Sequence, residues 1–103
     1  MIQIRRGTTP TMRFTLPIDV SLVKVARITY AQNDRELYVK TTEDCTLEGK
    51  TISHTLTQEE TFRFDSESLA QVQLRLLTTG GVVPPIEIEP IKVLPSIDEE
   101  VLA

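Results

Sequence analysis

Two residue types in this sequence could do nucleophilic chemistry, the single cysteine Cys45 and the single histidine His54. Glu48-Gly49 between them predicts a two-residue hairpin turn, because glycine readily adopts the positive φ that such a turn requires. In that register Cys45 faces Ile52 and His54 is its diagonal neighbour, which would bring a thiol near an imidazole. A cysteine nucleophile also needs an orienting group, an oxyanion site and a pocket, and no pattern here predicts them. We therefore interpret Cys45 as a small apolar strand residue and His54 as a polar residue at the sheet rim, and we do not expect an enzyme.

Metal and cofactor sites are not predicted either. One histidine and one cysteine cannot complete a tetrahedral zinc site. The segment Asp65-Ser66-Glu67-Ser68 alternates oxygen ligands but lacks the glycine and the length of a calcium loop. Gly80-Gly81 is followed by prolines and a strand pattern rather than by a helix, so it is not a phosphate-binding loop. We expect no cofactor.

Composition and charge narrow the class of protein further. The 103 residues are enough for one domain, and 40% hydrophobic and 25% charged residues are ordinary for a soluble globular protein. The formal net charge is −4, and Arg5, Arg6 and Arg13 are too few for a nucleic-acid-binding face. No apolar run is long enough to cross a bilayer, and the first ten residues lack the apolar centre of a signal peptide, so we expect no membrane contact. A lone cysteine excludes an internal disulfide and fits folding in a reducing cytoplasm.

Residues 51–81 form the stretch around which the fold is organised. The even-numbered residues from Ala70 to Leu76 are apolar and the odd-numbered residues between them are polar, a period of two that is typical of a strand with one buried face. Ahead of them, Thr57-Gln58-Glu59-Glu60 fits a capping box, in which the Thr57 hydroxyl and the Glu60 carboxylate each accept from the other residue's backbone N–H. This predicts a short helical turn near residues 57–62 that feeds a long central strand.

Similar alternation predicts strands at residues 2–6, 12–16, 26–30 and 37–41, with residues 45–47 and 50–52 as the arms of the hairpin. Seven or eight short strands at intervals of about 8–14 residues are typical of an antiparallel, immunoglobulin-like β-sandwich. We expect one such domain over residues 1–94 and a short tail over residues 95–103. The residues expected in its core are Ile4, Phe14, Leu16, Ile28, Tyr30, Val39, Leu56, Phe62, Val72, Leu74 and Leu76.

The C-terminal segment, residues 82–103, is the least regular part of the pattern. Proline cannot donate to a ladder, so a strand containing Pro90 must lie at a sheet edge or switch sheets there. Ser96-Ile97-Asp98-Glu99 is a second capping-box pattern, which predicts at most two helical turns in the tail. The segment has more apolar side chains than one edge strand can easily bury. The residues expected to form a contact surface are Ile86, Ile88, Ile91, Ile97, Val101 and Leu102.

Two interpretations of this segment stay open. Its apolar residues either complete the domain's own core, with a frayed tail, or serve a homo-oligomer or a docking arm. A surface of the second kind would suit a repetitive assembly.

Three stretches resemble small all-β proteins encoded in the tail-gene regions of phages and prophages of Gram-positive bacteria. They begin with Arg6-Gly7-Thr8-Thr9-Pro10, continue with the segment from Leu56 to Thr61, and end with the long strand that reaches Gly80. The same stretches resemble the N-terminal domain of the upper baseplate proteins of long-tailed phages. The likeness covers residues 5 to about 81, whereas Pro84, Pro85, Pro90 and the acidic tail depart from it.

The resemblance implies a structural, non-enzymatic virion component that acts through protein–protein contacts with other phage structural proteins. It implies a location in the virion, after assembly in the cytoplasm of the host bacterium. It contributes no functional residues. The alternative from another class is a carbohydrate- or cell-surface-binding module, although sugar-binding faces usually carry Trp or Tyr platforms and this chain has no Trp and two Tyr.

Overall fold

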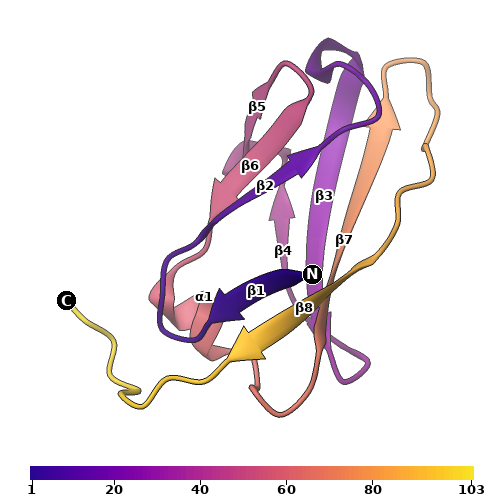
Figure 1. Cartoon of the computed structure of the whole chain (residues 1–103). Coiled ribbons are helices and arrows are strands. Elements are labelled where there is room, and N and C mark those ends of the chain that lie inside the picture. The colour runs from indigo at the N-terminus through magenta and orange to yellow at the C-terminus, as the bar shows by residue number, and fades with distance from the viewer.

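Two β-sheets pack face to face in the computed structural model, which describes residues 1–103 (Figure 1). One sheet has five strands in the order β1-β8-β7-β3-β4, and the other has three in the order β2-β6-β5. The strands are β1 (Ile2–Arg5), β2 (Thr11–Thr15), β3 (Val23–Gln32), β4 (Arg35–Thr41), β5 (Thr46–Glu48), β6 (Thr51–Thr55), β7 (Ala70–Thr78) and β8 (Glu89–Leu94). Short helices lie between them: η1 (Val20–Leu22), η2 (Thr42–Asp44) and α1 (Gln58–Phe62).

The strand order confirms the predicted immunoglobulin-like β-sandwich. When the eight strands are read in order as A, B, C, C′, D, E, F and G, one sheet is GFCC′ with the first strand added at its edge, and the other is BED. All neighbouring strands are antiparallel except β1 and β8, which pair in parallel from Ile2 opposite Ile91 to Arg5 opposite Leu94.

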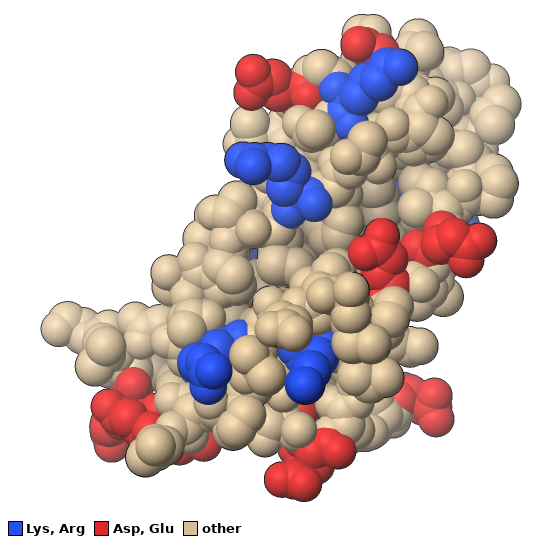
Figure 2. Space-filling view, viewed as in Figure 1, with Lys and Arg blue, Asp and Glu red and all other residues tan.

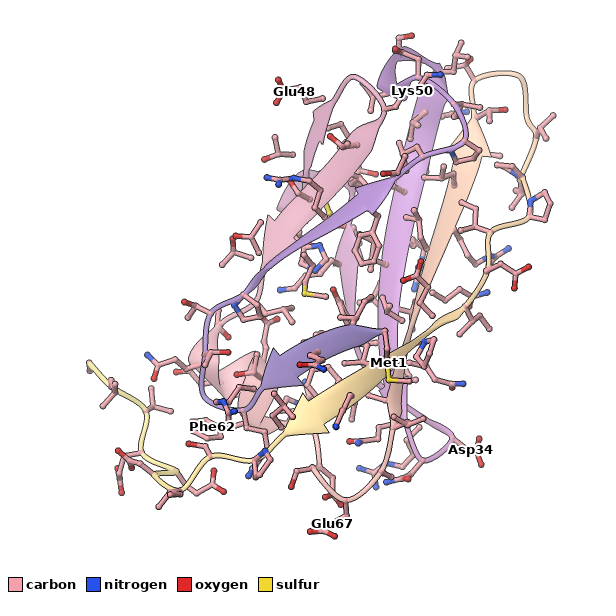
Figure 3. The ribbon with its side chains drawn as sticks, viewed as in Figure 1. Met1, Asp34, Glu48, Lys50, Phe62 and Glu67 are labelled. Atoms are coloured by element: carbon pink, nitrogen blue, oxygen red, sulfur yellow. The ribbon has the colours of Figure 1, made fainter.

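The core lies between the sheets and is mostly aliphatic (Figure 3). Of the predicted core residues, eight are buried: Ile4, Leu16, Ile28, Tyr30, Leu56, Val72, Leu74 and Leu76. The predicted Phe14 and Phe62 are only half-buried, and the core also takes residues that the prediction omitted, which are Met12, Ala26, Ile52, Phe64, Ala70, Ile91 and Val93. Phe64 rather than Phe62 is fully buried, and its ring packs edge-on against Tyr30 and Tyr38.

The inner face of β4 is the opposite of the predicted one. Val39 pairs with Thr29 on the outer face of the sheet, whereas Tyr38 pairs with the buried Tyr30. A register shift between Tyr30 and Ala31, where β4 carries an extra residue, decides which face each β4 side chain takes. The expectation that Val39 lies in the core was therefore wrong, and Tyr38 and Lys40 occupy the inner face instead.

The capping box before α1 is present as predicted. The Glu60 backbone N–H donates to the Thr57 hydroxyl at 3.1 Å, and the Thr57 N–H donates to the Glu60 carboxylate at 2.9 Å. Two backbone donors at the start of the helix are thereby satisfied, and the turn carries the chain from the three-stranded sheet to the five-stranded one.

Gly7 lies in the crossing from β1 to β2. Its φ is +80°, and a Cβ placed there would lie 2.6 Å from the Phe62 ring, so both the backbone and the space require glycine. The ring of Phe62 (labelled in Figure 3) thus lies against Gly7, and the Arg6 guanidinium lies 5.3 Å from the ring centre.

The C-terminal segment differs from two expectations. β8 is neither an edge strand nor a strand that switches sheets, because it lies between β1 and β7. Pro90 is tolerated because β1 begins to pair only at Ile91, one residue later. Residues 95–103 contain no helix. Asp98 instead accepts from the Glu100 N–H, and the tail runs outward from the sheets (Figure 1).

Candidate functional site

The predicted contact residues fall into three groups in the structure. Ile91 is completely buried, because it pairs with both Ile2 and Ala70 in the middle of the five-stranded sheet, so it was wrong to place it on a contact surface. Ile86 is half-buried and packs against the core. The remaining four are exposed: Ile88, Ile97, Val101 and Leu102.

Three of these exposed residues, Ile97, Val101 and Leu102, lie in the tail, which makes few contacts with the two sheets. Gln58 of α1 exchanges two hydrogen bonds with the backbone of Leu102, at 2.9 and 2.8 Å. Arg6 forms an ion pair with Glu99. The Ile97 side chain touches nothing that removes it from water, and Leu102 is 71% exposed. A long arm with exposed aliphatic side chains is the part of this molecule best placed to meet another surface.

A groove opens where the two sheets separate. β7 pairs with β8 at only three positions, Ala70 to Val72, because residues 82–88 carry Pro84 and Pro85 and form no strand. The rest of β7 therefore has no ladder on that side, and the outer edge of β2 has none either.

The groove has a volume of about 290 Å³ and an apolar floor that includes Phe14, Leu74 and Ile86. Arg13 of β2 lines one wall, and Glu87 and Glu89 line the other. In the view of Figure 2, basic side chains lie to the left of the hollow and acidic ones to the right. The groove has room for one or two aliphatic side chains. Its titratable side chains, Arg13, Glu87 and Glu89, do not lie beside a cysteine, serine or histidine in the lining.

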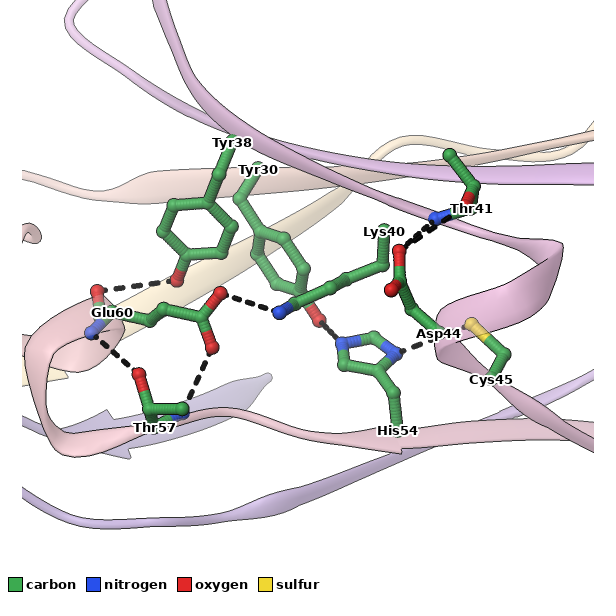
Figure 4. A network of polar contacts seen from close by, with 9 residues as sticks. All are labelled: Tyr30, Tyr38, Lys40, Thr41, Asp44, Cys45, His54, Thr57 and Glu60. Carbon is green, nitrogen blue, oxygen red and sulfur yellow. Dashed lines mark hydrogen bonds and ion pairs between the residues drawn. The ribbon is translucent and has the colours of Figure 1, made fainter.

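Cys45 and His54 do come together, because the turn lies one residue later than expected and the pairing is shifted by two residues. Leu47 rather than Cys45 lies opposite Ile52, so that the turn residues are Gly49 and Lys50. Gly49 has φ +59° as the first of these two residues. Cys45 Sγ then lies 4.0 Å from His54 Nδ1 (Figure 4).

The other ring nitrogen of His54 makes a shorter contact, which no sequence pattern predicted. His54 Nε2 shares a 2.6 Å hydrogen bond with the hydroxyl of the buried Tyr30. His54 is itself buried between the sheets rather than at the rim. Met12 opposite His54 on β2 and Tyr30 on the facing sheet close the site from both sides.

Electrostatics keep this pair neutral. Burial, helped by the nearby Lys40 ammonium, lowers the pKa of His54 to about 4. Burial and the Asp44 carboxylate raise the pKa of the Cys45 thiol. A thiolate–imidazolium pair needs the opposite shifts, so these surroundings do not favour an activated thiolate.

Lys40 and Glu60 complete the polar cluster. The Lys40 ammonium forms an ion pair with the Glu60 carboxylate, and both side chains are mostly shielded from water (Figure 4). Burial acts to raise the pKa of Glu60, but hydrogen bonds from Lys40 and from the Thr57 N–H outweigh it, and the pKa is lowered. The same carboxylate therefore neutralises a buried lysine and caps α1.

The polar groups of the Asp65–Ser68 segment, which was not expected to bind a metal, take part in local hydrogen bonds. In the Asp65–Ser68 segment, the Asp65 carboxylate accepts from the Glu67 N–H, and the carbonyls of Asp65 and Ser68 accept from the buried Gln32 amide. No three His, Cys, Asp or Glu side chains cluster so as to hold a metal ion. None of the five aromatic side chains is exposed, so no flat platform for a sugar ring forms on the surface.

A basic pair on the outer face of the five-stranded sheet was not predicted from the sequence. Arg27 of β3 lies directly opposite Arg75 of β7, and neither guanidinium makes an ion pair or hydrogen bond. Beside them, Val25 pairs with Leu77, and Val83 closes a hollow of about 170 Å³ that all five residues line. The alternation in both strands puts the two arginines outward, but only the observed register brings them face to face.

No family model, no curated protein and no solved structure matches this chain. None of the helices is long and apolar enough to cross a membrane.

Proposed function

We propose that the protein is a structural or assembly module of a phage or prophage tail, acting through protein–protein contacts and not as an enzyme. One observation carries the proposal. Residues 82–103 expose six aliphatic side chains, which are Val82, Val83, Ile88, Ile97, Val101 and Leu102, while the titratable groups between the sheets are paired with one another. Exposed apolar side chains concentrated in one segment are typical of a protein-binding surface.

Two further points support it. The three stretches of likeness to phage tail-region proteins lie within the sandwich, which serves here as a rigid support for the C-terminal segment. The buried Cys45–His54 contact is neutral and already satisfied by Tyr30, so the one candidate for enzymatic chemistry is occupied by a structural role.

The test uses the bacterium that carries the gene, with the chain tagged at its exposed Met1. DNA damage induces the prophage, and particles are separated from free protein on a density gradient. We expect the tagged chain to sediment with tails or whole particles. A double variant, Ile97→Asp with Leu102→Asp, should move to the free fraction, whereas Thr9→Asp with Thr46→Asp, which changes exposed polar residues to the same extent, should not.

Two results would contradict the proposal. One is a chain that stays in the free fraction both before and after induction while known tail proteins sediment. The other is micromolar binding to members of a glycan array, which would instead favour the carbohydrate-binding alternative.

A further inference from the structure

The basic pair on the outer sheet face has no counter-charge in the single chain. Arg27 and Arg75 lie directly opposite each other on neighbouring antiparallel strands. Like charges in this position repel, and no acidic side chain lies within ion-pair distance of either one. An anionic partner would remove that repulsion.

An aliphatic pocket adjoins the pair. Val25, Leu77 and Val83 line it together with the two arginines, and its volume is about 170 Å³. Val25 and Val83 are 41% and 50% exposed, unusually high for aliphatic residues on or beside a central sheet. We call these five residues the acceptor face. Its chemistry fits a ligand that carries carboxylates next to branched aliphatic side chains.

The tail of this chain has that chemistry. Asp98, Glu99 and Glu100 are three successive acids, preceded by Ile97 and followed by Val101 and Leu102. The three aliphatic side chains are exposed, and the acids carry one ion pair between them, Glu99 with Arg6. Both that ion pair and the hydrogen bonds of Gln58 to Leu102 are exposed, so water can replace them at little cost.

The tail is too short to lay its three acids on the arginines of its own molecule. The register of β7 with β8 puts Arg75 roughly 26 Å along the sheet from Leu94, where the tail begins. Glu100, six residues after Leu94, can extend at most about 22 Å, and Asp98 at most about 14 Å. Figure 1 shows the same separation, with the upper ends of β3 and β7 far from the end marked C. A contact that brings the acids to both arginines is therefore between two molecules.

We propose that the tail of one copy, residues 96–103, binds the acceptor face of a second copy, with its acids at Arg27 and Arg75 and an aliphatic side chain in the pocket. Each copy then both donates a tail and accepts one. Because the two surfaces differ, the contact is head to tail and builds a ring where the rotation closes or a filament where it does not. This inference rests on the proposed function, which it deepens by naming one partner, a second copy of the chain.

The experiment is sedimentation velocity on the full chain from 5 to about 500 μM, in low and in high salt. We expect the weight-average mass to rise above the 11.6 kDa of one chain with concentration, and to fall back in high salt because the contact is charged. Arg27→Glu with Arg75→Glu should weaken the association at least tenfold. Arg35→Glu with Lys50→Glu makes the same charge change at exposed residues outside the acceptor face and should keep at least half of the association.

A charge swap makes the test specific. A tail variant, Asp98→Lys with Glu99→Lys and Glu100→Lys, should also fail to associate alone. Mixed with the Arg27→Glu, Arg75→Glu variant, it should associate again, since its basic tail meets an acidic acceptor face. Melting curves of each variant confirm that it is folded, which we expect because neither arginine makes an internal hydrogen bond.

A full chain that stays monomeric at 500 μM in low salt would overturn the inference, as would an acceptor-face variant that associates like the unaltered chain. A monomeric chain that still sediments with phage tails after induction would overturn this inference alone and leave the proposed function standing.

Discussion

Charged and polar side chains meet on both faces of the five-stranded sheet, with opposite outcomes. On its inner face, Lys40 is paired with Glu60, and Tyr30 with His54. On its outer face, Arg27 lies against Arg75 with no counter-charge. Both groups are held on the same strands, β3 and its neighbours, so the backbone does not explain the difference.

The difference separates two uses of polar residues. Buried groups must be satisfied within the chain, because an unpaired one costs the free energy of its lost hydration. Exposed groups are under no such constraint, so an unfavourable exposed pair can persist where another molecule supplies the missing charge. Four changes test this division, from the largest expected effect to the smallest.

Ile28→Ala should destabilise the protein by about 2–5 kcal/mol, because it leaves a cavity at a completely buried position of β3. Val25→Ala, on the outer face of the same strand, should cost less than about 1 kcal/mol. Chemical unfolding followed by circular dichroism measures both. Similar losses for the two variants would mean that the outer face is packed as tightly as the core.

Acid should unfold the protein through His54. Its pKa is near 4 in the folded chain against 6.5 for an unperturbed histidine, so the unfolded state binds more protons as pH falls between these values. We expect the unfolding free energy to fall by up to about 3 kcal/mol between pH 7 and pH 4. Glu60, whose pKa is also lowered, adds a loss below its ordinary value of 4.5.

The control for the acid effect is His54→Gln, which cannot titrate. This variant should have a lower unfolding free energy than the unaltered protein at pH 7. Its unfolding free energy should then change little between pH 7 and pH 5. A parallel decline of the two proteins over that range would show that another group is responsible.

Tyr30→Phe should cost about 1–3 kcal/mol, since it removes the hydroxyl that satisfies a buried ring nitrogen of His54. Tyr38→Phe is the matched control. Its hydroxyl donates to the Glu60 carbonyl at 3.3 Å, so its loss should cost about 1 kcal/mol or less. Thermal unfolding at pH 7 ranks the two, and a larger loss for Tyr38→Phe would contradict the assignment.

Arg75→Gln should change stability by less than about 0.5 kcal/mol, of either sign, because it removes an exposed like-charge neighbour. Lys40→Gln should instead be clearly destabilising, by about 1–2 kcal/mol, since it leaves the shielded Glu60 carboxylate without its cation. If the outer-face variant is the less stable of the two at low protein concentration, the arginines serve the fold rather than a partner.

Local patterns in the sequence were enough to predict the elements whose structure depends on neighbouring residues. Alternation from Ala70 to Leu76 predicted β7 and its inner face, and the residues from Thr57 to Glu60 predicted α1 with its cap. These features depend on neighbours within a few positions. The sandwich followed from the spacing of such segments.

The features that could not be predicted depend on the register between strands that are far apart in the sequence. The register shift between Tyr30 and Ala31 turned Val39 outward. The β5–β6 turn lies one residue later than expected, which brought Cys45 opposite His54. The role of Tyr30 as partner of His54 arises across the two sheets, and the arginine pair arises across β3 and β7. The tail pattern at Ser96 failed to form a helix because so short a segment needs a surface to pack on.

The parallel pairing of β1 with β8 has a kinetic consequence. Ile2–Arg5 has one sheet partner, Glu89–Leu94, which follows all the other strands in the sequence. The strand β1 therefore stays without a sheet partner until β8 has been made. Closure across so long a sequence separation gives the fold a high contact order, for which we expect refolding in milliseconds to seconds rather than microseconds.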